Sequence, residues 1–172
     1  MTENVIIIPT RLEAIRLPNK PIKKINNKEM ILHVYEAAKK ANIGEVIVAS
    51  PNQQIYELIT SVKGICVKTR LDHKTGTDRI FEVFDKFLKR KPQTIINLQG
   101  DMPNIDPSAI KTLSNYMSKN LCDIATLGSK FKGDKEIENI DNVKVTTNDA
   151  LSVGKFDEAV DFFRDYENIK ER

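Results

Sequence analysis

Short apolar runs alternate with longer amphipathic stretches along the chain. The runs are rich in β-branched residues and cover residues 5–8, 45–49, 65–68, 94–98 and 123–127. Runs of this length and composition are typical of strands that are buried on both faces of a parallel sheet. The pattern therefore predicts five such strands.

Two of the stretches between the runs show helical periodicity. Apolar residues recur about every 3.6 positions over 29–41 and again over 77–88, as they do where one face of a helix packs on a core. These positions are Met30, Val34, Ala37, Ala38 and Ala41 in the first stretch and Ile80, Phe81, Phe84, Phe87 and Leu88 in the second. Each stretch is predicted to form a helix that packs on the sheet.

A third helix is indicated by the residues at its start. Asp106 and Pro107 suit the N-cap and the first position of a helix, and Ile110, Leu113 and Met117 follow at helical spacing. Strands that alternate with helices in this way favour right-handed crossovers and an open sheet with helices on both faces. The predicted fold class is therefore α/β.

The composition narrows the function. The 172 residues are 40% hydrophobic and 30% charged, which suits one globular core. A net charge of +3 does not indicate nucleic-acid binding, and no apolar stretch approaches the ~18 residues of a membrane span. Cys66 and Cys122 form no CxxC pair, and no apolar leader follows Met1. We expect a cytoplasmic protein with reduced cysteines and with neither a nucleic-acid nor a membrane partner.

Three cations follow the first predicted strand. Arg11, Arg16 and Lys20 lie in the loop after the 5–8 run, and ligands of open α/β sheets bind beyond the carboxyl ends of the strands. Guanidinium and ammonium groups suit phosphate oxygens, so the loop indicates a phosphate site. The alternative is a loop of solvated cations, because Arg and Lys are mostly exposed in proteins.

A second candidate site follows the 94–98 strand, where the chain reads Gln99, Gly100 and Asp101. A carboxylate at a strand end suits Mg²⁺, which takes oxygen ligands and bridges phosphates. The Gln99 amide suits a base edge or a sugar hydroxyl, and Gly100 lets the backbone approach a ligand closely. The same residues are also typical of a simple turn.

A third candidate site precedes the 77–88 helix. Thr75, Gly76 and Thr77 can cap a helix and leave backbone N–H groups for a base edge or an anion. His73 is close by, but no second histidine or cysteine lies at ligand spacing, which argues against a histidine metal site. We interpret His73 as a residue that orders the loop through hydrogen bonds; proton transfer is the alternative.

Taken together, these segments resemble a known family. The stretches IIPTRLEAIRLPNKP, TRLDHKTGTDRI and INLQGDMP, with NVKV over 142–145, are similar in order and separation to motifs of the 3-deoxy-manno-octulosonate cytidylyltransferases, also called CMP-Kdo synthetases. The resemblance extends over residues 4–147. It implies a Rossmann-like nucleotidyltransferase fold with three layers and a mainly parallel sheet. It also implies transfer of CMP from CTP to Kdo, with release of pyrophosphate, for lipopolysaccharide synthesis.

The resemblance implies catalytic roles in the first two sites. Arg11, Arg16 and Lys20 match the family's triphosphate-binding cations, and Asp101 matches a ligand of its Mg²⁺ cofactor. Lys20 and Asp101 are the expected catalytic residues. The Kdo hydroxyl would attack the α-phosphorus of CTP in line, so the protein would supply positioning and charge stabilisation and form no covalent intermediate.

The resemblance also implies contacts to the nucleotide. The residues matched to the family's segment around the nucleotide, or to its contact with the base and the sugar acid, are Thr75, Gly76, Thr77, Arg79 and Gln99. The segment before the predicted 77–88 helix thereby gains an expected ligand, CTP.

The chain departs from the family in two ways. Met102 stands where the family has Glu, and the HxGxYxY and GxDTxEDL segments have no counterpart. In the family, these segments supply a second metal-binding Asp, much of the Kdo pocket and the homodimer surface. We therefore expect a C-terminally truncated member, with one incomplete domain over 1–164 and a frayed, charged tail over 165–172.

Two hypotheses for the function follow. The first is an active CMP-Kdo synthetase, complete in an unusual way or completed by another chain. The second is a non-catalytic remnant that keeps the fold and at most binds CTP. A CMP-sialate synthetase is a further alternative, but the stretches TGTDR and LQGDMP favour Kdo.

Overall fold

The computed structural model describes residues 4–13, 17–119 and 122–165. Contacts between Cα atoms divide the chain into two compact units, Met1–Ala125 and Thr126–Arg172. The expectation of a single domain over 1–164 stays a prediction. Within the described ranges, every helix is too short or too polar to span a bilayer.

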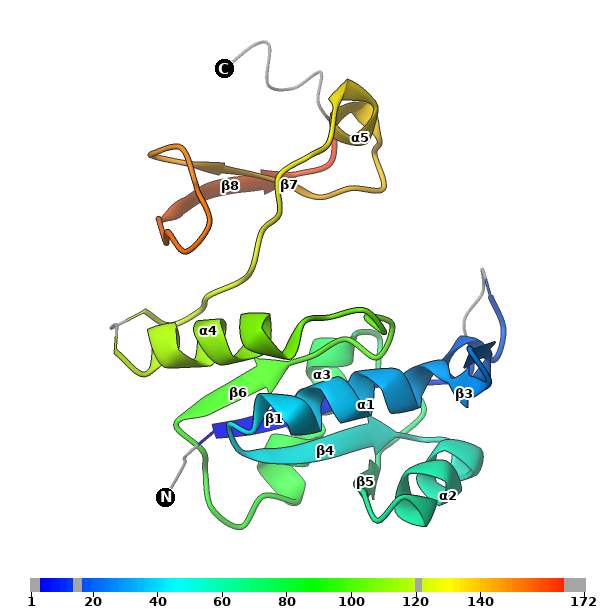
Figure 1. The fold of residues 1–172 in the computed structure, drawn as a ribbon. Helices are drawn as coiled ribbons and strands as arrows, with labels where there is room; N and C mark the ends of the chain where they lie inside the picture. Colours follow the sequence, from blue (N-terminus) through cyan, green and yellow to red (C-terminus); the bar gives the residue numbers. More distant parts are fainter. Residues whose placement is uncertain (1–3, 14–16, 120–121, 166–172) are drawn as a thin grey trace. The chain divides into compact units, whose positions relative to one another are not determined.

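A parallel sheet forms the centre of the first unit (Figure 1). Its strands, in the order β5-β4-β1-β6 across the sheet, are β1 (Asn4–Pro9), β4 (Glu45–Ser50), β5 (Ile65–Lys68) and β6 (Thr94–Asn97). In the register of the sheet, Ile7 of β1 lies between Ile47 of β4 and Asn97 of β6. The predicted parallel sheet and the first four predicted strands are thus confirmed.

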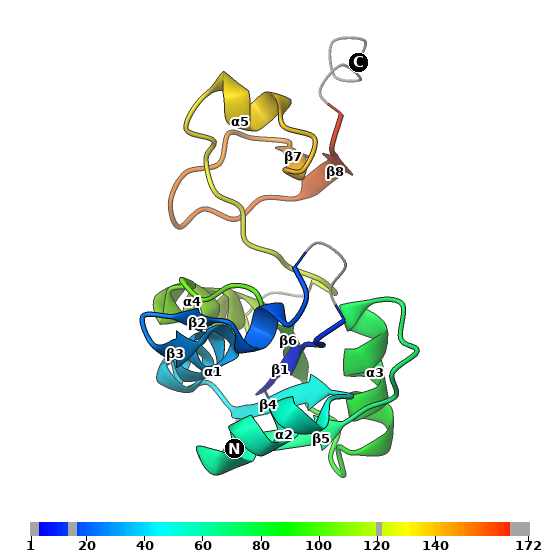
Figure 2. The same cartoon turned by 90° about the vertical axis from the view of Figure 1, so that its right-hand side faces the viewer.

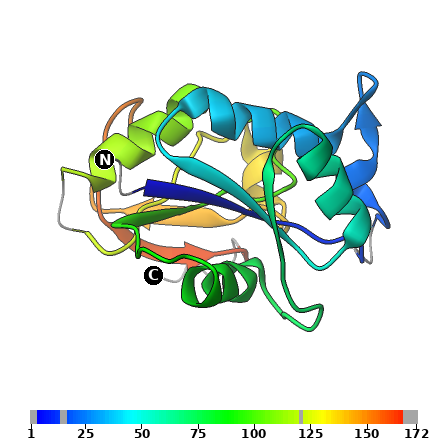
Figure 3. The ribbon, with the colours of Figure 1, turned by 90° about the horizontal axis from the view of Figure 1, so that it is seen from below.

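Helices cover both faces of this sheet (Figure 3). On one face, α1 (Met30–Ala41), α2 (Gln53–Ser61) and α4 (Pro107–Met117) form a core with Ile6 and Ile8 of β1. On the other face, α3 (Gly76–Lys86) packs on Ile7. Successive side chains of a strand point to opposite faces, so the three isoleucines of β1 supply both cores. The three-layer α/β architecture is confirmed.

Short elements lead from β1 to α1. They are the 3-10 helix η1 (Lys20–Ile22) and an antiparallel hairpin of β2 (Lys24–Ile25) and β3 (Lys28–Glu29). The start predicted for the third helix is confirmed in α4. The Asp106 carboxylate accepts a hydrogen bond from the Ser108 N–H at 2.8 Å, and Pro107 is the first helical residue.

The strand predicted over 123–127 is wrong. These residues are irregular, and Ile124 is 88% exposed. A strand needs a neighbour that pairs with its N–H and C=O groups, and in the described sheet β6 pairs with β1 alone. The segment also crosses the boundary between the two units. A short apolar run indicates burial without identifying the partner.

The apolar face predicted for 77–88 is partly wrong. Ile80 and Val83 are buried against the sheet, but Phe81 and Phe87 are 62% and 48% exposed. The reason is that the buried side of α3 is rotated away from the predicted side, and two charged residues take buried positions on it beside Ile80 and Val83. These residues are Arg79 and Glu82.

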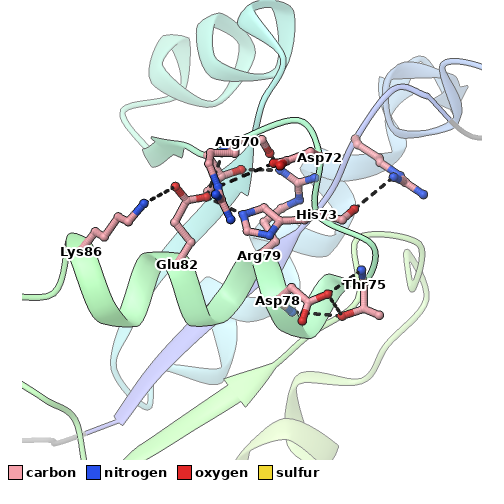
Figure 4. A network of polar contacts seen from close by, with 10 residues as sticks. Arg70, Asp72, His73, Thr75, Asp78, Arg79, Glu82 and Lys86 are labelled. Atoms are coloured by element: carbon pink, nitrogen blue, oxygen red, sulfur yellow. Dashed lines mark hydrogen bonds and ion pairs between the residues drawn. The ribbon is translucent and has the colours of Figure 1, made fainter.

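The loop between β5 and α3 is held on α3 by these buried charges (Figure 4). Glu82 accepts a hydrogen bond from the Arg70 N–H at 2.9 Å, and its carboxylate lies 2.5 Å from His73 Nε2. Arg79 donates to the Arg70 carbonyl at 2.8 Å and to the Thr69 hydroxyl. His73 is buried and has the loop-ordering role interpreted from the sequence.

The Glu82 carboxyl group is strongly acidic. Burial opposes its ionisation, but the hydrogen bonds from His73 and the Arg70 N–H outweigh burial. With a smaller contribution from Lys86, they lower the pKa of Glu82 to about 2. Glu82 is therefore an anion at neutral pH and only accepts hydrogen bonds, so His73 Nε2 carries the proton between the two side chains.

The second unit contains α5 (Asp134–Glu138) and an antiparallel hairpin of β7 (Lys144–Thr147) and β8 (Ala159–Phe163) (Figure 2). Lys144 is buried, and its Nζ donates to the carbonyls of Asn139 and Arg164 at 2.7 and 2.5 Å. These bonds tie the residue after α5 to the residue after β8. Of the predicted tail over 165–172, only residue 165 lies within the described residues.

We predict that the His73–Glu82 pair makes stability depend on pH. The pKa of Glu82 is lower in the folded protein than in the unfolded chain, so its contribution is present above about pH 4.5 and is lost as the pH falls towards 2. Urea unfolding at pH 6 and pH 3 is expected to show a larger loss of stability in the wild type than in Glu82→Gln. The expected difference is on the order of 1–3 kcal/mol.

Glu36→Gln is the matched control, because Glu36 is a partly exposed carboxylate paired with Lys28 at 2.8 Å. This variant should follow the wild-type pH dependence closely, since exposed ion pairs contribute little. Equal pH dependence in the wild type and Glu82→Gln would show that the buried pair is not what makes the fold acid-sensitive.

Candidate functional site

The three candidate sites meet in one pocket of the first unit. The pocket lies where the loops after β1 and β6 meet the N-terminus of α3, and its volume is about 240 Å³. Its polar and charged lining residues from the predicted motifs are Thr10, Arg11, Lys20, His73, Lys74, Thr75, Arg79, Gln99 and Asp101. Parallel strands present their carboxyl ends at the same edge, which explains why segments far apart in the sequence converge here.

Two predicted site residues are not among the lining residues. Thr77 faces a neighbouring depression, which it lines together with Asp78 and Phe81. Arg16 lies outside the described residues. Of the three cations predicted after β1, the structure thus places Arg11 and Lys20 at the pocket.

Two glycines set how closely the loops approach. A Cβ on Gly100 would lie 3.0 Å from Thr10 Cβ and 3.1 Å from the Pro9 carbonyl oxygen, and a Cβ on Gly76 would lie 3.2 Å from Pro9 Cγ. Both glycines are thus packed against the end of β1. The close approach of a ligand predicted for Gly100 stays a prediction; in this structure Thr10 and the Pro9 carbonyl lie against this glycine.

Lys20 and Asp101 form an ion pair in the pocket. Lys20 Nζ lies 2.8 Å from Asp101 Oδ2, and the two side chains are 36% and 55% exposed. The two predicted catalytic residues therefore come from different motifs and meet directly. An exposed pair of this kind is worth at most about 1 kcal/mol, so a ligand that binds either group can separate them.

The N-terminus of α3 is closed by a capping box (Figure 4). The Thr75 hydroxyl accepts from the Asp78 N–H at 3.1 Å, and the Asp78 carboxylate accepts from the Thr75 N–H at 3.0 Å. Hydrogen bonds from the Thr75 side chain and backbone lower the pKa of Asp78. The Thr75 hydroxyl and the N–H groups of Thr75 and Asp78 are thus engaged in capping, and the N–H groups of Gly76 and Thr77 are the part of this turn suited to a ligand.

Arg11 and Arg79 differ in how far they are buried. Arg11 is exposed, and its Nη1 lies 3.5 Å from the His73 carbonyl oxygen. Arg79 is 3% exposed, and its guanidinium is engaged with Thr69 and Arg70. Burial lowers the pKa of Arg79, and the nearby Arg11 cation lowers it further. Arg11 is available to an anion, whereas Arg79 supports the pocket wall and adds positive potential.

Gln99, in the loop after β6, also lines the pocket. Its Nε2 donates to Asn97 Oδ1 at 2.6 Å, and its amide lies 3.4 Å from the position of a Cβ on Gly76. The amide is thus oriented from its own strand end and lies beside the start of α3. This position suits the predicted contact to a base edge or a sugar hydroxyl.

One residue of the site region escapes sequence reasoning. Glu82 orders the loop that carries His73 and Lys74, yet it lies nine residues beyond His73. A signal was present, because Arg79 and Glu82 are three residues apart on a helix, on the side that also carries Ile80 and Val83. Charged residues on the buried side of a helix indicate a polar network.

Comparison with known proteins places this pocket in a family. The profile of the family described as "Cytidylyltransferase" matches residues 5–171. A 3-deoxy-manno-octulosonate cytidylyltransferase of Bartonella henselae is 40% identical over 144 residues, covering 83% of this chain and 59% of the relative. One of Nitrobacter winogradskyi is 40% identical over 147 residues, covering 84% and 58%. The chain thus spans less than two thirds of the length of these curated relatives.

Solved structures agree on the fold. A CMP:2-keto-3-deoxy-manno-octonic acid synthetase, solved in complex with CTP, matches with a TM-score of 0.78 and 32% identity over 98% of this chain and 68% of that chain. A cytidylyltransferase from Leptospira borgpetersenii shares the fold at 17% identity, with a TM-score of 0.61 over 70% of this chain and 51% of that chain. The resemblance predicted from the three motifs is confirmed, and the chain belongs to the cytidylyltransferase family.

Proposed function

We propose that this chain binds CTP and transfers its CMP group to 3-deoxy-manno-octulosonate (Kdo), with release of pyrophosphate. The observation that carries the proposal is the convergence of three motif segments on one pocket. This pocket is lined by several cationic side chains and by the carboxylate of Asp101. The activity by which the relatives are named, and the CTP bound to one of them, support this choice of nucleotide and sugar acid. We place the reaction in the cytoplasm, in the synthesis of lipopolysaccharide.

In this proposal, the pocket cations bind the triphosphate. Arg11 presents a forked set of donors, Lys20 presents a compact charge, and both residues line the pocket. Arg16, from the same loop, is proposed as a third cation. The turn at Thr75 and the Gln99 amide are proposed to contact the nucleotide and the sugar acid.

The proposed reaction is an in-line displacement at phosphorus. A Kdo hydroxyl oxygen forms a bond to the α-phosphorus of CTP and loses its proton to water. The bond from that phosphorus to the bridging oxygen breaks, so that pyrophosphate leaves with the electron pair. Negative charge grows on the leaving oxygens, where Lys20 and Arg11 can stabilise it. The protein's contribution is therefore positioning and charge compensation.

We propose Mg²⁺ as the cofactor, held in part by Asp101. Among the described residues, no group of three or more possible side-chain ligands comes together, so a site made only of protein ligands is not offered there. One carboxylate at the mouth of a phosphate pocket fits the usual way of binding Mg²⁺, through one or two carboxylates and substrate phosphates. The metal would neutralise phosphate charge and orient the triphosphate. Lys20 would compete with the metal for the Asp101 carboxylate.

We predict that CTP with Mg²⁺ stabilises the wild-type protein against heat, and that Asp101→Asn reduces the effect by weakening metal-dependent binding. Thermal shifts with and without CTP measure this step. Addition of Kdo is expected to release pyrophosphate from the wild type and much less from Asp101→Asn. Asp85→Asn is the control, since Asp85 is an exposed aspartate on α3 that lines neither pocket.

The outcomes separate the hypotheses for the function. A thermal shift with CTP but no pyrophosphate release on adding Kdo would favour the non-catalytic alternative. The absence of any shift with CTP would overturn the proposal as a whole.

We predict a second effect at the ion pair. Lys20→Met frees the Asp101 carboxylate, so without nucleotide the variant should bind Mn²⁺, used as a paramagnetic substitute for Mg²⁺, about 1.5- to 5-fold more tightly than the wild type. The same variant should bind CTP about tenfold more weakly than the wild type, because it lacks a cation that binds the phosphates. Water proton relaxation measures the metal, and calorimetry measures the nucleotide.

The chain offers a matched control for this prediction. Lys28 pairs with Glu36 at the same distance, 2.8 Å, and with similar exposure, but away from the pocket. Lys28→Met should change neither binding constant. If Lys20→Met and Lys28→Met behave alike, the Lys20–Asp101 pair does not control access to the carboxylate.

A further inference from the structure

Two charged side chains of α3 form hydrogen bonds with the backbone of one residue in the loop before the helix. The Glu82 carboxylate accepts from the N–H of Arg70, and the Arg79 guanidinium donates to the carbonyl of the same residue, at 2.9 and 2.8 Å. Residues three apart on a helix lie on the same face. Arg79 and Glu82 can therefore reach the carbonyl and the N–H of Arg70 at the same time. The start of the loop is thereby fixed on α3.

The same carboxylate also fixes the end of the loop that reaches the pocket. His73 places its ring against Glu82 at 2.5 Å, and its carbonyl oxygen lies 3.5 Å from Arg11 Nη1 (Figure 4). His73 and Lys74 both line the pocket. Within this loop, a single residue thus connects the buried carboxylate to an exposed cation of the β1 loop.

A charge at position 82 is costly, which calls for an explanation. Ile80 and Val83 pack on the sheet beside it, and a buried ion is stabilising only where its hydrogen bonds are satisfied. An apolar residue would fill the same space without that cost, but it would leave the Arg70 N–H and His73 Nε2 without their acceptor. The benefit of the carboxylate is a single arrangement of a pocket-lining loop.

We propose that Glu82 is a positioning residue for the triphosphate site: by holding Arg70 and His73, it sets the place of the His73 carbonyl and, through it, the orientation of the Arg11 guanidinium. This inference rests on the proposed function, since it names the anion site that Arg11 serves. Glu82 itself does not line the pocket. Its effect on a ligand therefore has to pass through the loop.

A double-mutant cycle tests this inference. Affinities for CTP and for inorganic triphosphate, both with Mg²⁺, are measured by calorimetry for the wild type, Arg11→Ala, Glu82→Leu and the double variant. Each single change is expected to weaken binding about tenfold, and the double variant should bind no more weakly than Arg11→Ala, because Glu82 acts through Arg11. A purely structural role for Glu82 gives independent effects that multiply to about 100-fold.

A conservative variant and a control sharpen the result. The amide oxygen of Glu82→Gln can still accept from Arg70 and His73, so this variant should bind within about threefold of the wild type. Glu36→Leu, a partly exposed glutamate on α1, should leave both affinities unchanged in either background. If Glu82→Leu does not fold, the cycle is run with Glu82→Gln, and its smaller loss should vanish in the Arg11→Ala background.

The outcomes for the inference and for the function are distinct. Coupled losses with triphosphate but no binding of CTP would support the inference and overturn the proposed nucleotide function. Binding of CTP with multiplying losses, or with no loss in Glu82→Leu, would overturn the inference and leave the function standing. Failure of the wild type to bind either probe would overturn both.

Discussion

The burial of β1 between two neighbouring strands is the constraint on which the rest of the first unit depends. Ile6, Ile7 and Ile8 are fully buried and supply the cores on both faces of the sheet. With β1 fixed beside β6, the loops that follow the two strands have to leave the sheet at the same edge. The pocket is therefore a consequence of strand order, and its residues add chemistry to a place that the hydrophobic core has already determined.

Several of the charged groups that line the pocket have partners before any ligand arrives. Lys20 holds Asp101, and Arg79 is engaged with the loop before α3. Binding of a nucleotide with its metal would thus exchange partners within a network of opposite charges. Buried members of the network, Glu82 and Arg79, keep the loop in place, while exposed members are free to change partners. The buried charged residues thus support the loop, and the exposed ones are those available to a ligand.

Sequence patterns predict the parts of this molecule that depend on local periodicity. Four strands and the caps at Thr75 and Asp106 follow from such patterns. The strand over 123–127 and the outward position of Phe81 do not, because burial depends on which neighbour is present. The motifs predict which residues gather at the pocket, but not that Lys20 meets Asp101, that Arg79 is buried or that Glu82 supports the loop. Each of these depends on contacts between segments far apart in the chain.

Gly100 has a consequence for how the pocket keeps its dimensions. A Cβ at this position would lie 3.0 Å from Thr10 Cβ and 3.1 Å from the Pro9 carbonyl oxygen, and Gly100 directly precedes Asp101. The separation between the backbone of Asp101 and the loop after β1 is thus limited by the Pro9 carbonyl oxygen and by Thr10 Cβ, and neither atom moves with a side-chain rotamer. Backbone in a packed core moves little, so thermal motion of the side chains changes this separation less than it changes an ordinary surface ion pair. The absence of a side chain at Gly100 therefore fixes how closely the backbone of Asp101 approaches the loop that carries the cations.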